Sequence, residues 1–314
     1  MGTCQGLCML EPSTNGESKI RIAHFSDVHI TVHQLGWKWR EFFGKRVTGW
    51  MNLKLLGRGM RFQHAPTVAR VLVTEFKKRR PDHLVFSGDA TALAFESEFA
   101  AASKVLAVHD PEMPPCLAIP GNHDCYTRKP VRECLFEKYF APWQVGERVD
   151  DETYPFAQRA GHVWLVGLNS STYNLFPWDA SGGVGPQQRD RLKRLLAQLP
   201  AGPRILVTHY PAVRPKGTPD HRLRRMRDWR ETIRVAAEGG VRLWLHGHRH
   251  RPFHLPEATH LPFPVICVGS ATQTKIWMYN EYTITGATLQ AVKRIYAPHE
   301  QVFHDRESFE LSLK

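Results

Sequence analysis

The sequence has few cysteines, no long apolar run and fewer acidic than basic residues. Its six cysteines form no Cys-x-x-Cys pair and no framework spacing, so reduced cytosolic thiols are the simplest interpretation. No stretch reaches the ~18 apolar residues that a transmembrane helix needs. Residues 1–18 lack a basic region followed by a long apolar run, so we expect no secretory signal and a cytoplasmic protein.

The shortage of acids leaves a formal net charge of +12 and a pI of about 9.6. This balance favours an anionic partner: a phosphorylated substrate, a nucleic acid or an acidic membrane face. With 42% hydrophobic residues over 314 positions, the chain can bury a substantial core. We predict a flexible lead-in over 1–18 and a single domain over 19–314.

Five apolar runs of strand length are each followed at once by Asp, Asn or His. The runs cover about 20–25, 83–86, 116–120, 204–207 and 241–245, and the side chains that follow them are Asp27 and His29, Asp89, Asn122 and His123, His209, and His248 and His250. Any one of these clusters alone could be an ordinary loop. In α/β sheets, however, functional groups gather beyond the carboxyl ends of strands, so we expect the five ends to meet.

Carboxylates and neutral imidazoles are ligands for first-row divalent metals such as Mn, Fe, Zn, Co or Ni. No thiolate is among the candidates, which excludes a structural zinc site of the Cys type. The spacings Asp27-x-His29 and His248-x-His250 can project two ligands from one loop, either onto one metal or across two.

Strands alternate with helices along most of the chain. We expect helices at about 65–79, 92–108, 129–140 and 187–199, and we expect the basic segment 214–230 to become a helix that runs through about residue 237. Further strands are expected at 153–158 and 162–168, and in the tail at 264–268, 281–285 and 291–296. This order predicts an α/β sheet sandwich with helices outside.

Five motifs together resemble those of the calcineurin-like metallophosphoesterase superfamily. In chain order they are Asp27-x-His29, Gly88-Asp89, Gly121-Asn122-His123-Asp124, Thr208-His209 and Gly247-His248-Arg249-His250. The resemblance spans roughly residues 20–270. It implies a four-layer α/β/β/α sandwich and a dinuclear metal centre that hydrolyses phosphodiesters or pyrophosphates.

Carried over position by position, the resemblance implies a role for each motif residue. The first metal would be held by Asp27, His29 and His250, and the second by Asn122, His209 and His248. Asp89 would bridge both metals, His123 would be the general acid or transition-state stabiliser, and Asp124 would orient it. Two metals ~3.5–4 Å apart can share a hydroxide that attacks phosphorus in line, and a histidine of near-neutral pKa suits the leaving group.

Two segments carry most of the net charge. Residues 33–63 combine eleven large apolar side chains with a local charge of +6, and residues 214–230 carry +5. Both follow candidate ligands, so we expect them to form a cap over the metals. The segment 33–63 is interpreted either as a lid packed on the body or as an interfacial patch, with aromatics at headgroup depth and basic side chains for anionic lipid.

A basic, apolar cap suggests an amphipathic substrate. The cap, with Gly121–Tyr126, Tyr139-Phe140 and His209-Tyr210-Pro211, resembles the membrane-associated UDP-diacylglucosamine pyrophosphatases of lipid A synthesis. That resemblance implies a lipid-linked nucleotide sugar hydrolysed by a peripheral protein at the inner face of the membrane. The alternatives are a soluble phosphodiesterase for cyclic nucleotides or glycerophosphodiesters, and a non-catalytic scaffold. A nucleic-acid partner is disfavoured because no recognition module is visible.

Overall fold

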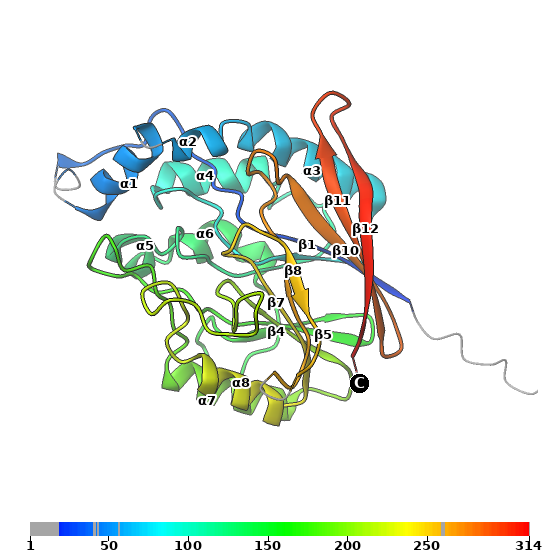
Figure 1. Cartoon of the computed structure of the whole chain (residues 1–314). Helices are drawn as coiled ribbons and strands as arrows, with labels where there is room; N and C mark the ends of the chain where they lie inside the picture. The colour runs from blue at the N-terminus through cyan, green and yellow to red at the C-terminus, as the bar shows by residue number, and fades with distance from the viewer. Residues whose placement is uncertain (1–18, 40–41, 43, 56, 259–260, 314) are drawn as a thin grey trace, which may run out of the picture.

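The computed structural model describes residues 19–39, 42, 44–55, 57–258 and 261–313. Two six-stranded sheets lie face to face, with helices on the outer side of each (Figure 1). The four-layer α/β/β/α sandwich expected from the sequence is confirmed. The lead-in expected at 1–18 lies outside the described residues.

The first sheet holds three of the five strands that precede candidate ligands. Its order is β12 (Val302–Ser312), β11 (Thr288–Ala297), β10 (Met278–Thr285), β1 (Ile20–Phe25), β2 (His83–Phe86) and β3 (Cys116–Ala118). Strands β1, β2 and β3 are parallel, whereas β10, β11 and β12 form an antiparallel meander beside them. The carboxyl ends of β1, β2 and β3 therefore meet at one edge.

The second sheet holds the other two strands that precede candidate ligands. Its order is β4 (Phe156–Ala160), β5 (Val163–Gly167), β6 (Arg204–Thr208), β7 (Val241–His246), β9 (Val265–Cys267) and β8 (Phe253–Leu255). Strands β5, β6, β7 and β9 run parallel, and the edge strands β4 and β8 are antiparallel. Four central strands buried on both faces explain the continuous apolar runs in the sequence.

Three apolar layers hold the sandwich together. Side chains from both sheets, among them Ile22, Val85, Ile205 and Leu243, fill the space between the sheets. The outer layers pack each sheet against its helices. Over the first sheet these are α3 (Ala65–Arg79), α4 (Glu96–Val105), α5 (Arg128–Arg132) and α6 (Leu135–Phe140), and over the second α7 (Pro186–Gln198) and α8 (Trp229–Glu238).

The structure corrects two of the expected helices. The helix predicted over 129–140 is broken into α5 and α6, because Cys134 adopts a left-handed φ of 47°. The helix predicted from the basic segment begins only at Trp229. Upstream of it, residues 222–224 form a turn, and residues 223–227 exchange backbone hydrogen bonds with residues 180–182.

Residues 33–63, which we call the cap, contain the short helices α1 (Lys45–Lys54) and α2 (Arg58–Arg61) at one end of the molecule (Figure 1). The cap is partly a packed lid. Trp37 stacks on Phe42 and packs edge-on against Phe95, with ring centroids 5.0 and 4.9 Å apart. Other large apolar side chains of the cap are exposed: Trp39, Phe42, Trp50, Met51, Leu55 and Met60. No helix among the described residues is long and apolar enough to cross a membrane.

Candidate metal centre

All the predicted ligands meet at the carboxyl edge of the two sheets. Asp27 and His29 follow β1, Asp89 follows β2, Asn122 follows β3, His209 follows β6, and His248 and His250 follow β7. Backbone hydrogen bonds tie the loops together within each sheet, from Asp27 N to the Gly88 carbonyl (2.9 Å) and from Gly247 N to the His209 carbonyl (3.2 Å). The His248 N–H donates to Asp27 Oδ2 at 3.0 Å and so links the two sheets.

The first cluster consists of Asp27, His29, Asp89 and His250. One donor atom from each lies within 4.8 Å of those of the other three. Nε2 of His29 is 3.1 Å from Nε2 of His250 and 3.5 Å from Asp89 Oδ2. Nε2 of His250 is 3.0 Å from Asp27 Oδ1. The four atoms thus surround a volume of the size of one ion.

The second cluster joins Asn122, His209 and His248 to the same Asp89. Asn122 Oδ1 lies 3.0 Å from Nε2 of His209 and 2.8 Å from Nδ1 of His248. Nε2 of His209 is 3.4 Å from Asp89 Oδ2, the atom that also faces His29. A single carboxylate oxygen therefore lies between the two clusters, as expected for a ligand shared by two ions.

The orientation of the imidazoles favours cations at both positions. Nδ1–H of His29 donates to the Thr91 carbonyl (3.2 Å) and Nδ1–H of His209 to the Ser87 carbonyl (2.8 Å). His250 likewise donates through Nδ1 to Gln273 Oε1 (2.6 Å). Each of these contacts leaves the Nε2 lone pair directed at the cluster. Lone pairs that converge at about 3 Å repel one another unless a cation lies between them.

The buried carboxylates point to the same conclusion. Oδ1 of Asp27 is buried and accepts no hydrogen bond from the described part of the chain. Burial favours a raised pKa for Asp89, but the charges of His209 and His123 hold it well below its usual range. A carboxylate that stays ionised in a buried site, as Asp89 does, needs positive charge beside it. The donor set of oxygen and imidazole nitrogen fits two first-row divalent ions.

The backbone at these positions is unusual. Asp27, His29, Asp89, His248 and His250 all adopt left-handed φ angles, between 49 and 69°. Residues with a Cβ reach this region at a cost of ~1–3 kcal/mol each, and such residues cluster at functional sites. The geometry lets alternate residues of one short loop aim their side chains at the same cluster.

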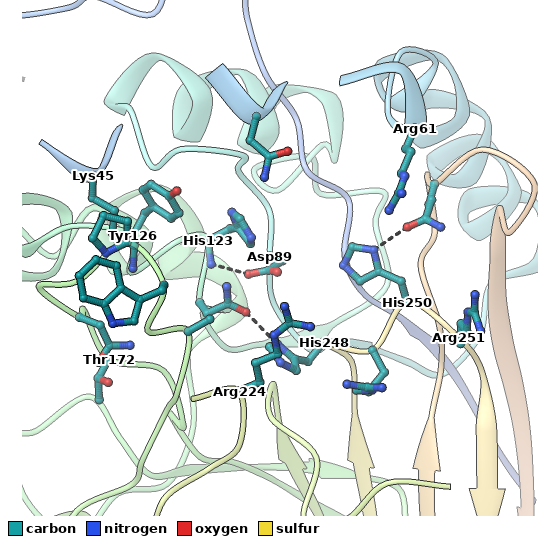
Figure 2. Close-up of a pocket in the computed structure, with 18 residues that line it drawn as sticks. Lys45, Arg61, Asp89, His123, Tyr126, Thr172, Arg224, His248, His250 and Arg251 are labelled. Atoms are coloured by element: carbon teal, nitrogen blue, oxygen red, sulfur yellow. Dashed lines mark hydrogen bonds between the residues drawn. The ribbon is translucent and has the colours of Figure 1, made fainter. Parts of the chain in front are cut away.

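His123 lies beside the clusters, pointing into the pocket (Figure 2). Its backbone N–H donates to Asp89 Oδ1 at 2.7 Å, and its Nδ1–H donates to the Ala92 carbonyl at 2.7 Å. The Asp124 carboxylate accepts from the backbone N–H groups of Gly121, Ala90 and Thr91. Asp124 therefore holds the loop that carries His123, whereas the Ala92 carbonyl orients the ring.

The pocket above the clusters has a volume of about 620 Å³. Lys45, Tyr126 and Thr172 lie on one side and Arg61, His250 and Arg251 on the other, with Arg224 near His248 (Figure 2). The cap and the basic segment 214–230 thus both reach the site. Arg249, which stands between two candidate ligands, lines the pocket and pairs with Asp220.

Several residues that carry no motif in the sequence support the site. Gln273, in the loop after β9, holds His250, and Ser270 Oγ donates to the Asp27 carbonyl at 2.7 Å. The ring of Tyr126 stacks on that of His123, with centroids 5.4 Å apart. Only the position of Tyr126, four residues after Asn122, could have signalled its role.

Comparison with known proteins agrees with this geometry. The sequence model of the calcineurin-like phosphoesterase family matches residues 20–252. The chain belongs to this family. No curated protein sequence matches it.

The fold is similar to that of a dimetal phosphatase from Danio rerio, with 12% identity and a TM-score of 0.63 over 94% of this chain and 99% of that one. A purple acid phosphatase from yellow lupin (Lupinus luteus) seeds is 12% identical, with a TM-score of 0.60. The match covers 94% of this chain and 54% of that one, so this chain spans about half of the lupin enzyme. GAP50, the anchor in the inner membrane complex of Plasmodium, is 12% identical, with a TM-score of 0.53; the match covers 94% of this chain and 89% of that one.

Proposed function

We propose that the protein is a dinuclear metal-dependent hydrolase of phosphodiester or pyrophosphate bonds. The observation that carries this proposal is the shared position of Asp89 Oδ2, 3.5 Å from Nε2 of His29 and 3.4 Å from Nε2 of His209. When bound, two divalent ions supply Lewis acidity at the phosphoryl oxygen and lower the pKa of an attacking water. Asp27, His29 and His250 would hold one ion, Asn122, His209 and His248 would hold the other, and Asp89 would be shared by both.

His123 supplies the proton that the leaving group needs. Its Nδ1–H is engaged with the Ala92 carbonyl, so Nε2 is the nitrogen that can exchange a proton with substrate. When water adds to phosphorus and the bond to the leaving oxygen breaks, protonation of that oxygen by the imidazolium avoids release of a basic alkoxide. Acid catalysis of this kind contributes ~10²–10⁴-fold.

The proposal is tested by replacing the shared carboxylate. The wild type, loaded with Mn, Fe, Zn, Co or Ni in turn, is given monoester, diester, cyclic-nucleotide and nucleotide-sugar-lipid substrates, and kcat/KM is compared. Asp89→Ala should abolish turnover and remove at least one metal, as measured by metal analysis. Two tightly held ions in Asp89→Ala would contradict the role of Asp89 as the shared ligand. A metal-loaded wild type that hydrolyses none of the substrates would favour a non-catalytic scaffold.

The charge of the pocket favours a substrate with more than one anionic group. Its lining includes five basic side chains, Lys45, Arg61, Arg224, Arg249 and Arg251. Among the described residues, the only carboxylate that lines it is Asp89, a candidate metal ligand. A pyrophosphate places a second phosphate within reach of such side chains, whereas a simple monoester uses the metals alone.

The surface around the pocket favours a lipid-linked substrate, such as a nucleotide sugar on a lipid at the face of a membrane. On the cap, Trp39, Leu55 and Met60 are 71, 69 and 71% exposed. Next to the cap, the loop 173–178 exposes Leu175 and Trp178 by 79 and 67%. Lys45 of the cap donates from Nζ to the Asp179 carbonyl at 3.3 Å, which brings the two exposed apolar groups to the same side of the pocket. Aromatic and basic side chains mixed in this way suit an anionic lipid interface.

Vesicle binding tests the membrane part of the proposal. Trp39→Ser/Leu55→Ser/Met60→Ser should weaken sedimentation with anionic vesicles and turnover of the lipid-linked substrate, but leave hydrolysis of a small soluble diester unchanged. The triple variant leaves Trp37 unchanged because Trp37 packs inward against Phe95. It also leaves Phe43 unchanged, because Phe43 lies outside the described residues. Val145→Ser is the control, since Val145 is also 71% exposed but does not line the pocket. A wild type that ignores such vesicles at low salt would instead favour a soluble phosphodiesterase for cyclic nucleotides or glycerophosphodiesters.

A further inference from the structure

The cap helix α1 contacts Tyr126, which stacks on the ring of His123, and the loop that contains the Ala92 carbonyl, to which that ring donates. We propose that α1, through Arg46 and Gly49, positions His123 for proton transfer, so that the cap is part of the reaction machinery as well as a lid. This inference rests on the proposed function, because it assigns a reaction role to His123.

Contacts with the Ala92 carbonyl and with Tyr126 orient the His123 ring, which also meets the ring of His29 edge-on, with centroids 4.9 Å apart. Its Nδ1–H donates to the Ala92 carbonyl at 2.7 Å, which fixes the rotation of the ring about its Cβ–Cγ bond. Tyr126 stacks on one face at 5.4 Å and 19° between planes. Movement of either the Ala92 carbonyl or the Tyr126 ring therefore redirects Nε2 of His123.

Arg46 of α1 holds the loop that contains the Ala92 carbonyl. Its side chain is buried, with 4% exposed, and Nε donates to the Leu93 carbonyl at 3.1 Å. A second guanidinium nitrogen donates to the carbonyl of Ala94, a residue with a left-handed φ of 56°. The guanidinium also lies 4.1 Å from the centroid of the Phe95 ring. A buried arginine tied to two successive carbonyls fixes the peptide planes that follow Ala92.

Glu98 completes the hold on this loop from the opposite side. Its Oε2 accepts from the N–H groups of Leu93 (2.9 Å) and Phe95 (3.1 Å). The carbonyls of the loop are thus held by the cap and its N–H groups by the body. Loss of Arg46 releases one side only, which predicts a displaced loop within an otherwise intact fold.

Gly49 of α1 controls the other contact. A Cβ at this position would lie 2.4 Å from the Tyr126 hydroxyl oxygen and 2.6 Å from Leu93 Cδ2. The leucine methyl can move at little cost, whereas the tyrosine ring is rigid and already stacked on His123. Nζ of Lys45, one turn earlier in α1, lies 4.9 Å from the centroid of the same ring. The helix therefore packs on Tyr126 at the one position where it has no side chain.

The test adds a single methyl group to α1. Gly49→Ala favours the helix itself, because Ala is the better helix former by ~1 kcal/mol, so a loss of activity reports the contact with Tyr126. We expect kcat to fall ~10-fold for a diester with an alkyl leaving group, with KM and bound metals unchanged; misplacement by ~1 Å costs up to ~10²-fold. Nitrophenolate needs no proton to leave, so kcat for a nitrophenyl diester should change little. The variant His123→Ala gives the largest loss of kcat expected for each of the two leaving groups.

Two further variants make the result specific. Thr48→Ala adds no bulk at the neighbouring exposed position and should behave as wild type. Gly49→Ala/Tyr126→Phe removes the oxygen that meets the new methyl and should recover part of the lost rate. Equal losses for both leaving groups, or no recovery in the double variant, would overturn the positioning role.

A spectroscopic measurement separates this inference from the proposed function. In the metal-free protein, the His123 imidazole signal, assigned by its absence in His123→Gln, should shift in Gly49→Ala, in Tyr126→Leu and in Arg46→Met, but not in Thr48→Ala. An unchanged signal in the first three variants refutes the positioning role, whatever the activity. If the signal shifts but the metal-loaded wild type hydrolyses nothing, the positioning contact stands and the proposed function fails.

Discussion

Two glycines allow the metal-binding loops to approach one another. A Cβ at Gly121 would lie 2.0 Å from Oδ1 and 2.3 Å from the backbone N of Asp89. A Cβ at Gly247 would lie 2.0 Å from Oγ of Ser26 and 2.6 Å from Oδ2 of Asp27. In each case a candidate ligand is among the obstacles, and it cannot move without leaving the cluster. These glycines are therefore as necessary to the site as the ligands beside them.

Gly121→Ala should leave a folded protein that binds metal poorly. The new methyl group displaces Asp89, the carboxylate shared by both clusters, so we expect both metal content and turnover to fall to near the level of Asp89→Ala. Metal analysis after gel filtration and circular dichroism measure the two properties. Gly183→Ala is the matched control, because its nearest neighbour would be 3.5 Å away. Full metal occupancy in Gly121→Ala would contradict the close approach.

At the scale of elements, β1, β10 and α3 are joined by a carboxylate that two arginines share. Glu281 on β10 is 8% exposed and pairs with Arg21 on β1 at 3.0 Å and with Arg79 at the end of α3 at 2.7 Å. Burial alone would raise the pKa of Glu281, but the hydrogen bonds from Arg79 and Arg21 lower it. The cluster fixes the amino end of β1, and hence the strand that carries Asp27 and His29.

Glu281→Gln should destabilise the protein by about 2 kcal/mol at pH 7, since hydrogen bonds to charged groups contribute ~1.5–3 kcal/mol. A lowered folded pKa means that this stability is present above the unfolded pKa of ~4.3 and is lost as the pH falls through the folded value. The difference in free energy of unfolding between wild type and variant, measured in urea, should therefore shrink from pH 7 towards pH 3. Glu310→Gln, on the exposed face of β12, serves as control.

Elements with a clear apolar period could be predicted from the sequence, and the others could not. Helices α3 and α7 and the strands before the ligands match their predicted ranges within a few residues. Strand β12 was missed because it is an edge strand whose residues are largely exposed, so its pairing with β11 decides its conformation. Helix α1 was missed because Gly44 and Gly49 interrupt the pattern, and Gly49 is there for its contact with Tyr126.

At the scale of the whole molecule, the sequence predicted which residues meet but not how they are held. Five ligand-bearing strand ends could be recognised because chain order and parallel pairing bring them to one edge. The left-handed backbone of the ligands and the carbonyls that orient the imidazoles depend on contacts between distant loops. No local pattern encodes such contacts. The same is true of the buried Glu98, which looks in the sequence like any acid in the first turn of a helix.

The pH dependence of stability should reveal Glu98. Burial, the largest cause, raises the pKa of its carboxyl to about 7, against the hydrogen bonds from Leu93 and Phe95. Because the folded state binds this proton more tightly, the stability it confers is present below the unfolded pKa of ~4.3 and is lost as the pH rises to about 7. The raised pKa of Glu98 corresponds to a loss of ~3 kcal/mol in the free energy of unfolding over this pH range.

Glu98→Gln keeps the shape and the acceptor oxygen but cannot ionise. The free energy of unfolding of wild type minus that of the variant, measured in urea with chelator, should therefore fall by ~3 kcal/mol between pH 4.5 and pH 8. Glu96→Gln is the matched control two residues away, where a hydrogen bond from Lys138 lowers the pKa of an exposed carboxyl. The free energy of unfolding of wild type minus that of Glu96→Gln should rise slightly with pH. A flat difference for Glu98→Gln would mean that Glu98 is ionised at neutral pH, with the neighbouring Arg46 supplying the compensating charge inside the contact between cap and body.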